Sequence, residues 1–236
     1  MRLWCCLLML LGSGVQAQSL ADPVALQREL TASGGDCSGR RVALPVISDG
    51  VERRANGALY RMNFNQVTEG WNWHPEAVLA NGDCYQYKFL PLASVEESRG
   101  KYRGEDKIGE TQRMKVSWRY DYFLAFDNLY DFYPRGVDDD AGFVASLPAL
   151  KAGQENVPLR MLAVMRLAAP FVSESTTFWK ATHAKPTDFT LKKRYLIGQL
   201  LEVWFCNSAS GEVLAKIRPR AQLQEAPRTE NLPTQR

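Results

Sequence analysis

The chain has 236 residues, of which 45% are hydrophobic, and its 29 Lys and Arg residues nearly balance 26 Asp and Glu residues to give a formal net charge of +3. So small an excess gives no support for nucleic-acid binding or for electrostatic attachment to anionic lipid. After the first 17 residues no stretch approaches the roughly 18 apolar residues of a membrane-spanning helix, so we expect no membrane span in the mature chain.

Residues 1–17 are typical of a secretory signal peptide. One basic residue, Arg2, precedes an apolar run that is too short to cross a bilayer, and small residues follow up to Ala17. We expect cleavage near Ala17 and a periplasmic or secreted protein. The rest divides into a single globular domain over 18–218 and a polar, proline-containing tail over 219–236, which we expect to be disordered.

The first part of the domain predicts one helix followed by strands. Asp22 is a suitable N-cap, Pro23 fits the first helical position, and the glycines at 34–35 end the helix. Asn-Gly at 56–57 lies between two strand-like runs and predicts a hairpin. Aromatic residues alternate with polar ones over 85–89, which predicts another strand.

The second part continues the strand pattern. Residues 96–109 are charged and contain glycine, so they predict an exposed loop. Apolar side chains alternate with polar ones over 114–126, which predicts one long strand with a bend or bulge. We expect a short helix over 143–150, a buried strand over 157–167, and a C-terminal hairpin that turns at 207–211.

These elements indicate a β-rich α+β fold. Because strands and helices do not alternate regularly, a parallel doubly wound sheet is improbable. We expect a mostly antiparallel sandwich or curved sheet with two or three short peripheral helices.

Three cysteines remain after the signal peptide: Cys37, Cys84 and Cys206. An oxidising compartment favours one disulfide and one leftover thiol. Cys37 and Cys84 share a Gly-Asp-Cys context, so we favour a Cys37–Cys84 bond, with Cys206 as a buried thiol at the end of an apolar strand. Pairing of Cys206 with either of the other two remains the alternative.

The most unusual local composition is Trp71-Asn72-Trp73-His74-Pro75-Glu76. In an extended segment Trp71 and Trp73 share one face, where they could stack on sugar rings or proline-rich peptides. His74 beside Glu76 could serve acid–base chemistry. The plainer interpretation is that both tryptophans anchor a loop to the core.

A loop rich in carboxylates contains Asp131, Asp138, Asp139 and Asp140. Such oxygens suit Ca²⁺, which takes six to eight ligands. The spacing does not match a known calcium loop, and three adjacent aspartates cannot all face one ion. We therefore favour a role in capping the element at Phe143, with the other carboxylates solvated.

No catalytic or cofactor motif appears in the sequence: the spacings of zinc proteases, α/β-hydrolases and phosphate-binding loops are all missing. We therefore expect no cofactor. His183 and Asp188 are the remaining candidates for a catalytic pair. The basic run 192–194 predicts a solvated face or a surface that meets an acidic partner.

These features together favour an exported binding or interaction protein of the cell envelope, with a protein as its partner and a glycan as the next possibility. One alternative is an exported hydrolase that uses His74 or His183 with a nearby carboxylate such as Glu76 or Asp188. Another is an envelope assembly factor or an immunity-type protein that neutralises a toxin.

Overall fold

The computed structural model describes residues 20–33, 37–47, 51–54, 57–60, 87–105, 111–132, 143–145 and 158–220. Most of them lie in strands, as the sequence predicts. In chain order the elements are α1 (Pro23–Ser33), β1 (Arg41–Val46), β2 (Val51–Arg54), β3 (Gly57–Tyr60), β4 (Lys88–Glu105), β5 (Thr111–Phe126), the 3-10 turn η2 (Leu129–Asp131), β6 (Phe143–Ala145), β7 (Leu159–Trp179), β8 (Thr187–Asn207) and β9 (Val213–Ile217).

The main sheet has six strands in the order β1-β7-β8-β5-β4, and β9 pairs with the C-terminal part of β8. Neighbouring strands are antiparallel except β5 and β8, which run parallel. A second sheet has the order β2-β3-β6. Its β2–β3 hairpin confirms the hairpin predicted around Asn-Gly at 56–57, but Gly57 already belongs to β3 and pairs with Arg54 instead of lying in the turn.

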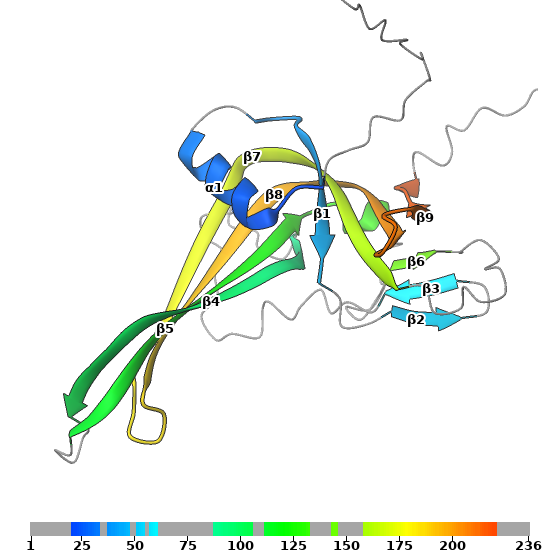
Figure 1. The fold of residues 1–236 in the computed structure, drawn as a ribbon. Helices are drawn as coiled ribbons and strands as arrows, with labels where there is room; N and C mark the ends of the chain where they lie inside the picture. The colour runs from blue at the N-terminus through cyan, green and yellow to red at the C-terminus, as the bar shows by residue number, and fades with distance from the viewer. Residues whose placement is uncertain are drawn as a thin grey trace, which may run out of the picture.

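Four strands of the main sheet extend beyond the core. Figure 1 shows β4, β5, β7 and β8 continuing together, away from α1 and β1, as a long narrow arm. We define the arm as residues 93–105, 111–122, 172–179 and 187–194. The β1 strand pairs with β7 only over residues 161–166, so it does not reach the arm.

Helix α1 packs on one face of the sheet at the base of the arm (Figure 1). The predicted N-cap is confirmed, because Asp22 Oδ1 accepts a hydrogen bond of 2.9 Å from the backbone N–H of Val24. Leu26 and Leu30 are one helical turn apart and are both buried in the main core cluster. The helix therefore covers the hydrophobic base of the sheet with one side.

The alternation predicted for 114–126 is confirmed by β5. Met114, Tyr120, Tyr122, Leu124 and Phe126 are buried, and the last four join the core face under α1. No register shift interrupts β5 in its pairing with β8. The irregularities lie in the partner strand β4, where the register shifts near residues 92 and 99.

The loop predicted over 96–109 is wrong as far as Glu105, because β4 continues to that residue in pairing with β5. The charged side chains of β4 find partners across the hairpin. Ser117 Oγ donates to Glu96 Oε1 at 2.7 Å, and Arg99 donates to the Tyr120 hydroxyl at 3.0 Å. A solvated strand needs no apolar face when cross-strand polar pairs support it.

The helix predicted over 143–150 is also wrong at its start, where Phe143–Ala145 forms β6 and pairs with β3. Phe143 is fully buried and its ring lies 6.0 Å from that of Phe132. Tertiary packing of this ring decides the local structure in favour of a strand. Within the described ranges α1 is the single α-helix, fewer than the two or three expected.

The strand predicted over 157–167 is confirmed by β7, which begins at Leu159 and runs on to Trp179. Between Leu167 and Val172 the register against β8 shifts, around a cis Ala169–Pro170 bond and a left-handed Phe171. Gly198 lies opposite Leu167 at this point. A Cβ on Gly198 would lie 2.3 Å from the carbonyl oxygen of Arg166, so only glycine permits the close approach of the two strands.

The predicted C-terminal hairpin is confirmed by β8 and β9. Asn207 Oδ1 accepts hydrogen bonds from the N–H groups of Ala209 and Ser210, and Gly211 takes the left-handed conformation at φ 76°. Residues 1–17, predicted as a signal peptide, and residues 221–236 lie outside the described residues.

Cys206 is buried in β8 with a free thiol, as the sequence predicts, and burial raises its pKa. Cys37 is also a free thiol in this structure. Cys84 lies outside the described residues, so the Cys37–Cys84 bond stays a prediction. Among the described residues we find no helix with the length and hydrophobicity required to cross a bilayer.

Candidate functional site

Polar and aromatic side chains line the arm on the face that continues the core under α1. The parallel register places Tyr120 beside Lys192 and Tyr122 beside Arg194, while Glu174 lies opposite Arg194 on β7. We call this surface the cation–aromatic face. It consists of Arg99, Trp118, Tyr120, Tyr122, Glu174, Lys192 and Arg194.

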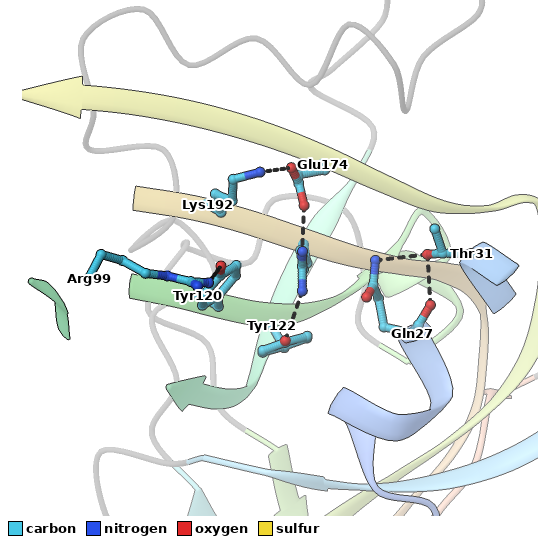
Figure 2. A network of polar contacts seen from close by, with 8 residues as sticks. Gln27, Thr31, Arg99, Tyr120, Tyr122, Glu174 and Lys192 are labelled. Atoms are coloured by element: carbon cyan, nitrogen blue, oxygen red, sulfur yellow. Dashed lines mark hydrogen bonds and ion pairs between the residues drawn. The ribbon is translucent and has the colours of Figure 1, made fainter. Parts of the chain in front are cut away.

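Arg194 connects three strands of this face through its hydrogen bonds to Glu174 and Tyr122, the two labelled ends of the dashed lines at the centre of Figure 2. Its Nε donates to Glu174 at 2.7 Å, and its Nη1 donates to the Tyr122 hydroxyl at 3.1 Å. The guanidinium carbon also lies 4.6 Å from the centre of the Tyr120 ring. These contacts fix the guanidinium in one position with its charge only partly offset by Glu174.

Trp118 is half-buried at the centre of the arm and two cations lie over its ring. The guanidinium of Arg99 lies 4.9 Å from the ring centre and the ammonium of Lys192 lies 5.3 Å from it. Cations favour this position because the face of an aromatic ring is negative. The indole is therefore engaged by the chain's own side chains.

Glu174 is the carboxylate that organises these cations. Lys192 Nζ donates to one of its oxygens at 2.8 Å and Arg194 donates to the other. Partial burial raises the pKa of Glu174, but the hydrogen bonds from Lys192 and Arg194 outweigh it and hold the pKa below its usual value. Glu174 is thus ionised at neutral pH.

A groove opens at the base of the arm between α1 and the sheet. It has a volume of about 490 Å³ and is lined by Gln27, Arg28, Thr31 and Ala32 of α1, Val172, Ser173 and Glu174 of β7, and Arg194 of β8. Figure 2 shows Gln27 and Thr31 of α1 joined by hydrogen bonds to each other.

The groove can both donate and accept hydrogen bonds. The side-chain amide of Gln27 donates to the Thr31 hydroxyl at 3.1 Å, and that hydroxyl donates to the backbone carbonyl of Gln27 at 2.8 Å. Two arginines and one glutamate line the groove, so its charge is positive. Such a lining suits a polar ligand with a negative group.

The basic run predicted as one surface is divided between the two faces of the sheet. Lys192 and Arg194 lie on the cation–aromatic face, whereas Lys193 lies on the opposite face beside Asp121. Burial lowers the pKa of Lys193, and the charge of Asp121 offsets part of this effect. The interpretation of 192–194 as a single solvated face is therefore wrong.

Asp188 lies at the outer end of the arm and holds the β7–β8 turn together. Its carboxylate accepts hydrogen bonds from the Tyr102 hydroxyl at 2.8 Å, from Lys180 Nζ at 3.0 Å and from the N–H of Ala181 at 2.7 Å. His183 is exposed in the same turn, and its carbonyl accepts a long hydrogen bond from Gln112. Asp188 therefore contacts Lys180 and Ala181 of the turn and Tyr102 of β4 rather than the His183 ring.

The other predicted site residues are only partly covered by the structure. Trp71, Trp73, His74 and Glu76 lie outside the described residues, as do Asp138, Asp139 and Asp140. Asp131 lies in the turn η2, where Oδ2 accepts a hydrogen bond of 3.0 Å from Asn128. In the described ranges no group of three or more His, Cys, Asp or Glu side chains is placed to hold a metal ion.

The groove could not be predicted from the sequence. The i, i+4 pair of Gln27 and Thr31 looks like any polar side of a helix, and Glu174 is 20 residues from its partner Arg194. The alternation of aromatic residues on β5 was visible, but the sequence did not show which strand would supply the cations beside them.

No protein-family model, no curated protein and no solved structure matches this chain.

Proposed function

We propose that this chain is an exported interaction protein that binds an acidic segment of a protein partner in the groove between α1 and the arm. The observation that carries this proposal is the groove itself, which is about 490 Å³ in volume and has a positive lining with both donors and acceptors. An extended polypeptide offers backbone groups for these donors and acceptors, and an acidic side chain complements Arg28 and Arg194.

A protein partner is favoured over a glycan by the surroundings of Trp118. Sugar rings bind by stacking on an accessible aromatic face. Arg99 and Lys192 lie over the Trp118 ring, so a sugar would have to displace them. Arg99 is paired with Glu97, and Lys192 and Arg194 are paired with Glu174, so three cations face two carboxylates and the excess positive charge favours a carboxylate ligand.

Site-specific photo-crosslinking in the cells that export the chain tests this proposal. A photoreactive residue replaces Ala32, which is exposed and lines the groove. The matched control replaces Ala25, an exposed alanine two helical turns away that does not line it. We expect one protein adduct from position 32 and none from position 25.

Charge reversal identifies the chemistry of the adduct. Arg28→Glu should reduce the crosslink several-fold, whereas Arg113→Glu, at an exposed position of the arm, should not change it. Equal adducts from positions 32 and 25, or a crosslink that is insensitive to Arg28→Glu, would contradict binding of an acidic segment in the groove. If a glycan blocks the crosslink from position 32 and no protein adduct forms, the ligand of the groove is a carbohydrate and the proposed protein partner is wrong.

Export is part of the same proposal and rests on the signal-like residues 1–17. The protein recovered from its native compartment should begin at or near Gln18, as determined by N-terminal sequencing. A chain that keeps Met1 in the cell would contradict export.

A further inference from the structure

We propose that two copies of this chain form a closed dimer by pairing their β7 strands over residues 172–179, edge to edge along the two arms. This inference does not require the partner proposed for the groove, although Val172, Ser173 and Glu174 belong both to the groove lining and to the paired edge. It rests on the difference between the two edges of the arm and on which side chains are exposed along them.

One edge of the arm is built to resist pairing. The β4 strand carries many charged residues over 94–105, and its register against β5 shifts near residues 92 and 99. Charges and bulges are the usual means by which an edge strand avoids association with another sheet. The β4 edge is thus protected.

The other edge has none of these protections. Over residues 172–179 the β7 strand has one charged residue, Glu174, and no proline, and it keeps a continuous register with β8. Glu174 is already bound to Lys192 and Arg194. Within the part of the chain that the structure describes, β8 is the single strand paired with this stretch, because β1 reaches only Arg166.

Large apolar side chains are exposed at the same edge. Phe178 is 55% exposed and Trp179 is 48% exposed, and they follow two exposed threonines, Thr176 and Thr177. Aromatic and β-branched residues are those that favour pairing in a sheet. Their exposure on an unprotected edge is explained if a further strand covers it.

The geometry of the edges favours a second copy as the occupant. With one open and one protected edge, self-association stops at two chains instead of growing into a filament. In an antiparallel pair with Thr177 on the two-fold axis, Glu174 lies opposite Lys180 of the second copy and Trp179 lies opposite Ser175. Lys180 is paired with Asp188 of its own chain, but its side chain is 66% exposed, so it places a positive charge opposite Glu174 at both ends of the pairing.

Sedimentation equilibrium of the purified mature chain at concentrations up to about 100 μM tests the dimer. We expect a monomer–dimer equilibrium in the wild type. Phe178→Lys puts a charge on the open edge and should raise the dissociation constant about tenfold or more. Val95→Lys, which places the same charge at an exposed position of β4, should leave it unchanged.

A photoreactive residue at Thr177 provides a second measurement that does not depend on the stability of a variant. It should crosslink the chain to itself as a dimer on a denaturing gel, whereas the same residue at Val95 should not. A wild type that stays monomeric, forms larger assemblies, or dimerises with equal crosslinking from both positions would overturn the proposal.

Discussion

Lys192 and Lys193 are adjacent in the sequence, but they lie on opposite faces of the sheet and in opposite electrostatic surroundings. Lys192 donates a hydrogen bond to Glu174 and lies over the Trp118 ring. Lys193 is partly buried beside Asp121, and burial lowers its pKa. The fold therefore provides partners for the charge of Lys192, whereas it makes the charged form of Lys193 less favourable.

Substitution of these two lysines should therefore change stability in opposite directions. At neutral pH Lys193→Met should raise the free energy of unfolding by less than about 1 kcal/mol, since solvent still screens part of the charge. Lys192→Met should lower it, because Glu174 loses a donor. Urea unfolding of both variants and the wild type measures the difference. Destabilisation by Lys193→Met would contradict the penalty assigned to its charge.

The pH dependence gives a second test of Lys193. A lysine with a lowered pKa in the folded state binds fewer protons there than in the unfolded chain. Its contribution to stability therefore rises as the pH increases from the lowered pKa towards the ordinary value of about 10.4. The wild type should approach the stability of Lys193→Met over this range. If the difference in the free energy of unfolding between the wild type and Lys193→Met does not change with pH, the charge of Lys193 is not the cause of that difference.

Glu174 and Arg194 should be energetically coupled. Both are only partly exposed, at 33% and 25%, and Arg194 also bonds Tyr122. A double-mutant cycle with Glu174→Gln and Arg194→Gln should give a coupling of about 1 kcal/mol. The control is the ion pair between Glu29 of α1 and Arg40, whose side chains are 52% and 42% exposed, and it should give a coupling near zero. If both pairs give the same coupling energy, the surroundings of Glu174 and Arg194 do not strengthen their ion pair beyond that of an exposed one.

Acid should weaken the arm through Glu174. Its pKa is held below the ordinary value despite partial burial, so its stabilising contribution is present above the unfolded pKa of about 4.3 and is lost as the pH falls through the lowered one. Between pH 7 and pH 3 the melting temperature of Glu174→Gln should fall less than that of the wild type. An equal fall of the melting temperature in both proteins would contradict a stabilising role of the ionised Glu174.

The sequence predicted those features of the fold that depend on neighbouring residues. The cap at Asp22, the helix after it and the long alternation of β5 are local patterns, and each is found in the structure. The extension of β4 could not be predicted, because its charged residues read as a loop until cross-strand partners such as Ser117 are known. The groove was missed for the same reason, since Arg194 meets α1 only through the tertiary fold.

Gly198 should not tolerate a side chain. Its missing Cβ would lie 2.3 Å from the backbone oxygen of Arg166, and a backbone atom cannot move aside as the end of a flexible side chain can. Gly198→Ala should lower the free energy of unfolding by about 3 kcal/mol or more. Gly39→Ala, where φ is 80° but no atom lies within 4 Å, should cost about 1 kcal/mol. Chemical denaturation compares the two variants, and a smaller effect at Gly198 would contradict the close approach.

Ser173 should be replaceable by alanine without loss of stability. Its hydroxyl oxygen is buried and has no hydrogen-bond partner in the structure, so removing it removes a desolvation cost. Ser173→Ala should be neutral or stabilising by up to about 1 kcal/mol, as measured by thermal unfolding. A clear decrease in stability would reveal a hydrogen bond to this hydroxyl.

The parallel pairing of β5 with β8 has a consequence for how the chain folds. The β4–β5 and β7–β8 hairpins each connect strands that are close in the sequence, whereas Thr187 pairs with Lys115, which is 72 positions earlier in the chain. Closing so long a loop is entropically unfavourable until many contacts form at once. The two hairpins should therefore form early and independently, and their docking along the parallel seam should limit the rate of folding.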